Sequence, residues 1–375
     1  MRSEITTFPI SRRNFLVMGA ATMACAWCRA GESPIFVPQS AHEALFYKRM
    51  DDGSVQCELC PRRCRVKDGL RGYCHVRENR GGKYYSLVYG RACTTNLDAI
   101  EKKPFFHVYP GTKAFSIATV GCNIHCKFCQ NYDISQAKPE DISVPYRSPE
   151  EIAELAVSRG AKTLAFTYSE PTIFYEYMHD CARAAKERGV ESVVVTNGFI
   201  NDAPQQELFP LVKAIKIDLK AFTQSFYGQT CSGSLQPVLD TLKRLSQSGV
   251  WYEIVNLVIP TLNDNTEDIQ RLSAWIVKEL GPDVPIHFTR YTPMYRLKNL
   301  PPTPAETLLT ARAIAMKEGC HFAYCGNQPG MEGEHTFCPS CKKAVVKRYG
   351  FSVTENNLET GKCKFCGTVI PGVWG

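Results

Sequence analysis

The cysteines constrain this chain more than any other feature, because they fall into three zones with short, regular spacings. The chain holds 18 cysteines in 375 residues, more than an ordinary core requires for packing. The spaced cysteines are Cys57, Cys60, Cys64 and Cys74; Cys122, Cys126 and Cys129; and Cys338, Cys341, Cys363 and Cys366. Thiols at such spacings bind metal ions or clusters, so we expect a fold organised around metal centres.

Between the second and third zones, short apolar runs alternate with amphipathic helical segments. Strands are predicted at 115–119, 163–167, 192–196, 214–219, 251–259 and 286–291. Helices are predicted to begin at Ser148 and at Thr303, each an N-cap followed by proline, and another helix at 266–280. About six strand–helix units predict an α/β fold with a parallel sheet, either a partial barrel or a doubly wound sheet.

Composition and charge set the domain organisation. The chain is 44% hydrophobic and 22% charged, as in a folded protein, and no apolar run is long enough to span a membrane. The net charge of +7 arises in residues 57–113, which hold 12 Lys and Arg against 5 Asp and Glu. Such a window could bind nucleic acid, an acidic partner or an anionic cofactor, or it could simply be a solvated surface. We expect a leader at 1–30, a basic Cys-rich module at 31–110, the α/β domain at 111–330 and a four-cysteine ribbon at 331–375.

The leader contains Ser11-Arg12-Arg13-Asn14-Phe15-Leu16 before a short apolar stretch. This pattern resembles a twin-arginine export signal, which would place the protein in the periplasm. A disordered basic leader is the alternative.

The central cysteines directly follow the first predicted strand of the α/β domain. Three thiolates at spacings of four and three residues can ligate three irons of a cubane cluster and leave the fourth iron open. A zinc ion would need a fourth ligand nearby, for which His125 is awkwardly placed. No Walker-type loop and no dinucleotide fingerprint follows a strand, so phosphoryl transfer and dinucleotide binding get no support.

The loop from Cys122 to Cys129, with Phe128 before the last cysteine, resembles the signature of the radical S-adenosylmethionine (SAM) superfamily. Segments 57–64, 72–77 and 100–104 resemble the family of pyruvate formate-lyase activating enzyme. The resemblance to the radical SAM enzyme of the AmmeMemoRadiSam system is closer, and it is supported by segments 129–131, 134–136 and 366–374. The likeness covers about residues 45–375.

This resemblance implies a partial parallel (β/α)6 radical SAM barrel with the two Cys-rich modules at its flanks. It implies a 4Fe–4S cluster on Cys122, Cys126 and Cys129, with SAM on the open iron. One electron would then yield a 5′-deoxyadenosyl radical that abstracts hydrogen from an unidentified substrate, an oxidoreductase-type reaction. The implied partners are a flavodoxin- or ferredoxin-type reductant and proteins of the Ammecr and Memo types. Chemistry at such low potential points to the cytoplasm, against the export signal, so the location stays open.

Polar residues at the ends of the predicted strands are the candidate SAM contacts, because ligands of parallel sheets collect there. Glu170, in the place of the family's Gly-Gly-Glu segment, would accept the SAM ammonium, or else begin a helix. Asn197 would bind the ribose or methionine moiety. Asp218 and Lys220 share one face of a strand and either hold the SAM carboxylate or form a structural pair. Further candidates are Phe128, Asn256 and His287. The alternative for His287 is a core histidine without a SAM contact. No catalytic residue is predicted.

The flanking cysteines predict two further sites. The C-terminal pairs, two C-x2-C turns 21 residues apart, are typical of a zinc ribbon or a rubredoxin-like iron site, with disulfides as the competitor. We expect zinc there. The N-terminal quartet would hold zinc or an auxiliary iron–sulfur cluster, and the sequence does not choose. Segment 326–330 either lines the substrate opening or is a plain turn.

Other functions remain open at this stage. An activase would place a radical on a backbone glycine of a partner, and an RNA- or protein-modifying enzyme would use the basic window. A non-enzymatic zinc-ribbon scaffold could bind nucleic acid through the same window. A disulfide-stapled periplasmic protein is the last alternative.

Overall fold

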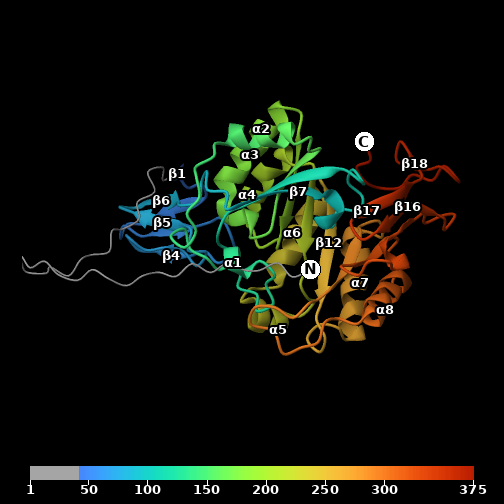
Figure 1. The fold of residues 1–375 in the computed structure, drawn as a ribbon. Helices are drawn as coiled ribbons and strands as arrows, with labels where there is room; N and C mark the ends of the chain where they lie inside the picture. Colours follow the sequence, from blue (N-terminus) through green and yellow to red (C-terminus); the bar gives the residue numbers. More distant parts are fainter. Residues whose placement is uncertain (1–41) are drawn as a thin grey trace, which may run out of the picture. The chain divides into compact units, whose positions relative to one another are not determined.

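One curved sheet organises the structure, a computed structural model that describes residues 42–375 (Figure 1). Seven of its strands run parallel, and β7 joins one edge antiparallel to β8. In spatial order the strands are β14 (Ala323–Gly326), β13 (Ile286–Arg290), β12 (Trp251–Val258), β11 (Ala214–Asp218), β10 (Glu191–Thr196), β9 (Thr163–Phe166), β8 (Lys113–Ala118) and β7 (Thr94–Ala99). Within the described residues β14 and β7 end the ladder, so the barrel is open.

Helices connect successive parallel strands and flank the sheet (Figure 1). The six predicted strands and the (β/α)6 arrangement are confirmed, with β14 as an additional parallel strand. The α-helices are α1 (Tyr132–Ser135), α2 (Pro149–Ser158), α3 (Tyr175–Glu187), α4 (Asp202–Leu208), α5 (Gln224–Phe226), α6 (Gln236–Ser246), α7 (Thr266–Leu280) and α8 (Ala305–Lys317). Short 3-10 helices lie at Ile100–Lys102, Pro171–Phe174, Phe209–Leu211 and Glu332–Glu334, and one π-helical turn at Tyr227–Cys231.

Of the two predicted N-caps, the one at Ser148 is confirmed and the one at Thr303 is wrong. At α2 the Ser148 side chain accepts from the Glu151 amide and the Glu151 side chain accepts in return, so the capping box is confirmed. At α8 the prediction is wrong, because Pro304 occupies the N-cap position and makes no side-chain bond. The Thr303 hydroxyl is buried instead and donates to the carbonyl of Val258 at 2.6 Å, so it ties the segment after β13 to β12.

The N-terminal module consists of two small antiparallel sheets. One contains β1 (His42–Glu43), β6 (Lys83–Ser86) and β5 (Arg77–Arg80), and the other β2 (Tyr47–Arg49), β3 (Val55–Cys57) and β4 (Arg65–Val66). A buried ion pair joins the module to α3, because Arg77 Nη2 lies 2.8 Å from Glu176 Oε1 and both side chains are 1% exposed. The predicted leader at 1–30 lies outside the described residues.

The C-terminal ribbon contains β15 (Thr336–Phe337), β16 (Ala344–Tyr349) and β17 (Ser352–Asn356), followed by the hairpin of β18 (Leu358–Glu359) and β19 (Lys362–Cys363). Buried Arg348 attaches it to the barrel by donating to the carbonyl of Phe106 at 2.7 Å. The last residues add a second attachment, since Val373 and His107 bond through their backbones at 2.7 Å. No helix among residues 42–375 is both long and apolar enough to cross a membrane.

Candidate active site at the carboxyl edge of the sheet

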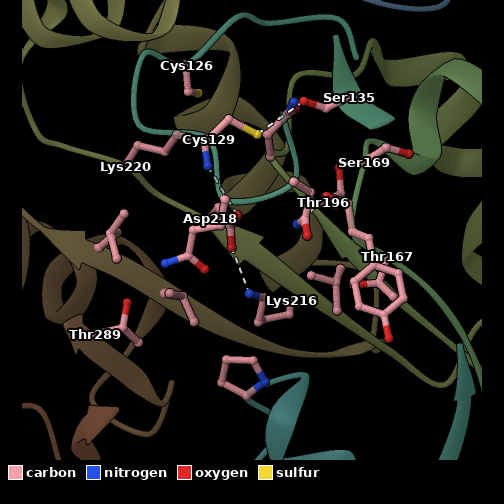
Figure 2. Close-up of a pocket in the computed structure, with 18 of the residues that line it drawn as sticks. Cys126, Cys129, Ser135, Thr167, Ser169, Thr196, Lys216, Asp218, Lys220 and Thr289 are labelled. Atoms are coloured by element: carbon pink, nitrogen blue, oxygen red, sulfur yellow. Dashed lines mark hydrogen bonds and ion pairs between the residues drawn. The ribbon is translucent and has the colours of Figure 1, made fainter. Parts of the chain in front are cut away.

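The carboxyl ends of β8, β9, β10 and β11 meet at one edge of the sheet, where a cavity of about 500 Å³ opens. A volume of this size is typical of small-molecule sites. The loop after β8 lines the cavity together with polar residues that end the next three strands. Figure 2 shows Cys126, Cys129, Asp218 and Lys220 gathered around it.

The loop after β8 brings three cysteines to this cavity. Gly121 opens the loop at φ +98°, and a Cβ there would lie 2.7 Å from Val76 Cγ1, so only glycine fits. Cys122 and Cys126 are buried, Cys129 is half-buried, and all three line the cavity.

The donors around these sulfurs suit thiolate ligands. The amides two residues beyond Cys122 and Cys129 donate to their sulfurs, and the Ser135 hydroxyl lies 3.1 Å from Cys129 Sγ. Within residues 42–375, these three thiols do not form a group with all ligand atoms within 4.8 Å. A single zinc ion would draw them closer than that. The set therefore fits three corners of a larger iron–sulfur cluster.

A fourth thiol lies beside this loop and was not predicted as part of the site. Cys231, in the π-helical turn, donates to Cys126 and lowers the pKa of that thiol. Burial raises the pKa of Cys231 well above its ordinary value, so it stays protonated as the donor. Its sequence neighbourhood has no metal-ligand spacing, so only the fold reveals the contact.

Glu170 is both a helix start and a cavity residue. Its Oε1 accepts from the Thr172 amide at 2.9 Å and the Thr196 hydroxyl at 2.6 Å, and its Oε2 accepts from the Asn197 amide at 2.9 Å. Burial raises the pKa of this carboxyl despite those donors. Three fixed donors hold the carboxylate rigidly at the cavity wall, and its contact with SAM stays a prediction.

Asn197 joins the end of β10 to the cysteine loop. Its Nδ2 donates to Asn123 Oδ1 at 2.8 Å and lies 3.8 Å from Cys122 Sγ, while its Oδ1 accepts from the Phe199 amide at 2.8 Å. The side chain therefore orients the Cys122 thiol, and the predicted ribose or methionine contact stays a prediction.

Three charged side chains of one strand face meet at the cavity. Asp218 bridges Lys216 Nζ at 2.7 Å and Lys220 Nζ at 3.2 Å; Figure 2 shows the first of these contacts. Burial opposes the charge of Asp218, yet the two ammonium groups lower its pKa to about 2. Burial also opposes the charge of Lys220, but Asp218, Cys126 and two further neighbours together outweigh it and raise that pKa. Lys216 was not predicted, although the period of two that selected Asp218 and Lys220 also selects it.

Of the remaining predicted SAM contacts, one lines the cavity and two do not. Phe128 lines the cavity, with Lys220 Nζ 5.8 Å from its ring centroid. His287 does not line it: it stands at the second position of β13, near the amino edge, with Nε2 2.7 Å from Glu253 Oε2. This corrects the prediction in favour of the core histidine. Asn256 is also outside the lining and donates to the Leu219 carbonyl at 2.8 Å.

Several cavity residues come from segments that the sequence left without a role. Lys102 and Lys103 reach it from the segment after β7, Thr289 and Arg290 from β13, and Phe351 from the turn between β16 and β17. Asn327 also lines it, as the first alternative for segment 326–330 predicted.

The four thiols of the C-terminal quartet form a compact group. The sulfurs of Cys338 and Cys366 are 3.6 Å apart, those of Cys341 and Cys363 are 3.7 Å apart, and all four lie within 4.8 Å of one another. These separations suit one tetrahedral ion with four thiolate ligands. Every cysteine in residues 42–375 is a free thiol, so the described part has no disulfide.

The N-terminal quartet also lies together. Burial first, and then the charges of Cys57, Cys74 and Cys64, raise the pKa of Cys60 to about 12. Several basic side chains of this module are paired with carboxylates, as Arg71 is with Glu78 inside the module and with Glu140 outside it. This pairing weakens the case for a nucleic-acid surface there.

The chain is similar in sequence to known proteins. Residues 116–273 match the family model of the Radical SAM superfamily. The uncharacterized protein MJ0808 of Methanocaldococcus jannaschii is 45% identical over 332 residues, which cover 88% of this chain and 98% of that protein. The pyruvate formate-lyase 1-activating enzyme of Escherichia coli is 24% identical over 221 residues, or 53% of this chain and 87% of the enzyme. A solved domain of a pyruvate-formate lyase-activating enzyme from Bacteroides vulgatus is 19% identical over 44% of this chain and 99% of that chain, with a TM-score of 0.40.

Proposed function

The chain belongs to the radical SAM superfamily, and from this membership we propose that it is an enzyme whose 4Fe–4S cluster and SAM occupy the cavity at the carboxyl edge of the sheet. One observation carries the proposal: the three loop cysteines line the same cavity as Glu170 and Lys220. Together the bound cofactors supply one-electron cleavage of SAM to methionine and a 5′-deoxyadenosyl radical, which abstracts hydrogen from the substrate.

The residues of the chain hold and orient these groups. Cys122, Cys126 and Cys129 would ligate three irons, while Asn197 and Cys231 donate toward two of those sulfurs. This support fixes the ligands before the cofactor binds.

Charge complementarity suggests how SAM would lie. Lys216, Asp218 and Lys220 present a net single positive charge to the cavity, which would attract the SAM carboxylate. Across the cavity wall, the fixed carboxylate of Glu170 would accept the SAM ammonium. Phe128, beside Lys220, would pack against an apolar part of the ligand.

For the substrate, we propose the type that the AmmeMemoRadiSam enzymes act on, with Ammecr- and Memo-type proteins as partners and a flavodoxin- or ferredoxin-type donor of the electron. The sequence segments at 129–131, 134–136 and 366–374 support this assignment. The similarity to pyruvate formate-lyase 1-activating enzyme supports a second candidate, an activase that generates a glycyl radical on a partner.

The test is anaerobic reconstitution with iron and sulfide, followed by reduction, addition of SAM and assay for 5′-deoxyadenosine. We expect product from the wild type and from Cys320→Ala, a buried thiol remote from the cavity lining. Replacing Cys122, Cys126 and Cys129 with alanine should abolish it. A wild type that carries its cluster, yet neither binds nor cleaves SAM, contradicts the proposal.

The two substrate classes separate in a second assay. An activase would leave a glycyl-radical signal in the electron paramagnetic resonance (EPR) spectrum of a co-expressed partner. Deuterium transfer into 5′-deoxyadenosine from a labelled small molecule or side chain would favour the other class.

A further inference from the structure

The N-terminal quartet of Cys57, Cys60, Cys64 and Cys74 has no part in the proposed function, and only the comparison with the loop of Cys122 rests on that function. Cys64 Sγ accepts from the Tyr73 amide at 3.5 Å. The Cys57 amide donates to the Cys64 carbonyl at 2.9 Å, and the Arg63 amide donates to the Cys60 carbonyl at 3.1 Å. A Cβ at Gly72, two residues before Cys74, would lie 3.8 Å from Cys64 Sγ and 2.7 Å from the Tyr84 hydroxyl. These contacts bring the four cysteines together inside the module.

The backbone at this quartet repeats the conformation found at the C-terminal metal site. There Lys342 follows Cys341 with a positive φ of 61°, and the amide of the next residue donates to the Cys341 sulfur. His75 follows Cys74 with the same φ of 61°, and the next amide donates to the Cys74 sulfur. A side chain in the left-handed region strains the backbone, and a bound metal centre would offset this cost.

Buried donors beside the quartet also lack acceptors. Among the described residues, Arg77 Nε and Nη1 have no hydrogen-bond partner, although the side chain is only 1% exposed. Within the same part of the chain the Tyr84 hydroxyl is also buried without a partner, and it lies beside Cys64, because a Cβ at Gly72 would meet both side chains. Leaving such donors unpaired is costly. Thiolates and inorganic sulfide are acceptors that would satisfy them.

The two cysteine quartets differ in the spacing of their sulfurs. The C-terminal sulfurs lie 3.6 and 3.7 Å apart in pairs, as one tetrahedral ion requires. Among residues 42–375, no three thiols of the N-terminal quartet lie within 4.8 Å of one another, and the same holds for the loop of Cys122. A cubane keeps its ligand sulfurs farther apart than one ion does, because four irons stand between them.

We propose that the N-terminal quartet binds a second iron–sulfur cluster, with all four thiolates as ligands. Since four cysteines leave no iron open, this cluster would not bind SAM. It would lie against the loop of the first cluster, because the Tyr73 ring stacks on His125 at 4.4 Å between centroids. The Cys74 carbonyl also lies 3.0 Å from the Cβ position of Gly121 in that loop.

The test removes the first cluster and counts what remains. The full chain with Cys122, Cys126 and Cys129 replaced by alanine is reconstituted anaerobically, and iron, zinc and acid-labile sulfide are measured per chain. We expect about four sulfide ions and about four irons per chain to remain. Acid-labile sulfide decides the outcome, because neither zinc nor a single iron in the C-terminal site contributes any.

A second variant keeps the result interpretable. Adding Cys64→Ala and Cys74→Ala, the two half-buried members of the quartet, should remove the remaining sulfide, and circular dichroism checks that the barrel is folded. Adding Cys320→Ala instead should remove none. Zinc without sulfide in the folded loop variant would overturn the proposal, as would sulfide that survives loss of Cys64 and Cys74.

Discussion

Replacing Asp218 should test whether the charged groups of the cavity depend on one another for stability. Its carboxylate holds Lys216 and Lys220, whose side chains are 5% and 13% exposed. The Asp218→Asn variant keeps the size of the side chain but leaves two buried ammonium groups without a counter-charge. We expect a clear loss of stability, since uncompensated buried charge is among the costlier defects in a protein.

The magnitude follows from the proton affinity of the carboxyl. Its pKa falls from 3.8 to about 2 in the folded protein, and one pKa step corresponds to about 1.4 kcal/mol, so the charged form is favoured by roughly 2 kcal/mol. Repulsion between the two lysines adds to this loss. The expected decrease in the free energy of unfolding at pH 7 is therefore about 2 to 4 kcal/mol.

The assay is anaerobic urea unfolding at pH 7, followed by tryptophan fluorescence. The matched control is Glu279→Gln, which breaks the surface pair of Lys243 and Glu279 at 2.7 Å, with exposed fractions of 45% and 26%. That change should cost about 0.5 kcal/mol or less. If Asp218→Asn costs no more than the control, the three charges do not form the buried network described here, and the reasoning is refuted.

Three further predictions concern the loop, the amino edge of the sheet and the ribbon. Gly121→Ala should lower the iron and sulfide retained by the loop, whereas Gly160→Ala, with φ +64° and open space around its Cβ, should cost only about 1 kcal/mol of stability; equal iron and sulfide loss in both variants would contradict this. Burial lowers the pKa of His107 to about 4 from 6.5, so the unfolded chain takes up the proton first and stability should fall by up to about 3 kcal/mol as pH drops between these values. In urea unfolding across that range, His107→Gln should flatten the slope, and an unchanged slope would refute the assignment. Cys341→Ala should release about one zinc per chain and make the ribbon sensitive to limited proteolysis; release of iron would identify a rubredoxin-like site instead.

Elements with a strong local pattern could be predicted from the sequence. The six predicted strands are apolar and mostly buried, and α2 has its N-cap, proline and capping glutamate in sequence. β7 was missed because its residues, Thr-Thr-Asn-Leu-Asp-Ala, are polar and only partly buried at the edge of the sheet. Its pairing with β8 supplies the order that its own sequence lacks.

The sequence predicts on which side of a strand the site residues lie, but not at which end of the strand. A period of two places Asp218 and Lys220 on one side of β11, and it would have added Lys216. For His287 the same reasoning gave the wrong edge, because periodicity does not tell which end of a five-residue strand a side chain occupies. The donor role of Cys231 depends on a contact between segments about a hundred residues apart, and no local pattern encodes it.

The ribbon shows how a module remote from the cysteine loop can still shape the cavity. The sheet is open between β14 and β7, and the β16–β17 hairpin contacts segments that follow both strands. A Cβ at Gly350 would lie 3.6 Å from Pro329, after β14, and one at Gly111, after β7, would lie 3.6 Å from Val353.

Phe351, at the tip of the same hairpin, lines the cavity. A metal ion held by the C-terminal quartet would fix the loops at the base of this hairpin, since Cys338 precedes β16 and Cys363 closes β19. It would therefore stabilise the cavity wall between β14 and β7 without contacting any ligand in the cavity. For this reason loss of the ion should weaken SAM binding while leaving the iron and sulfide of the loop in place.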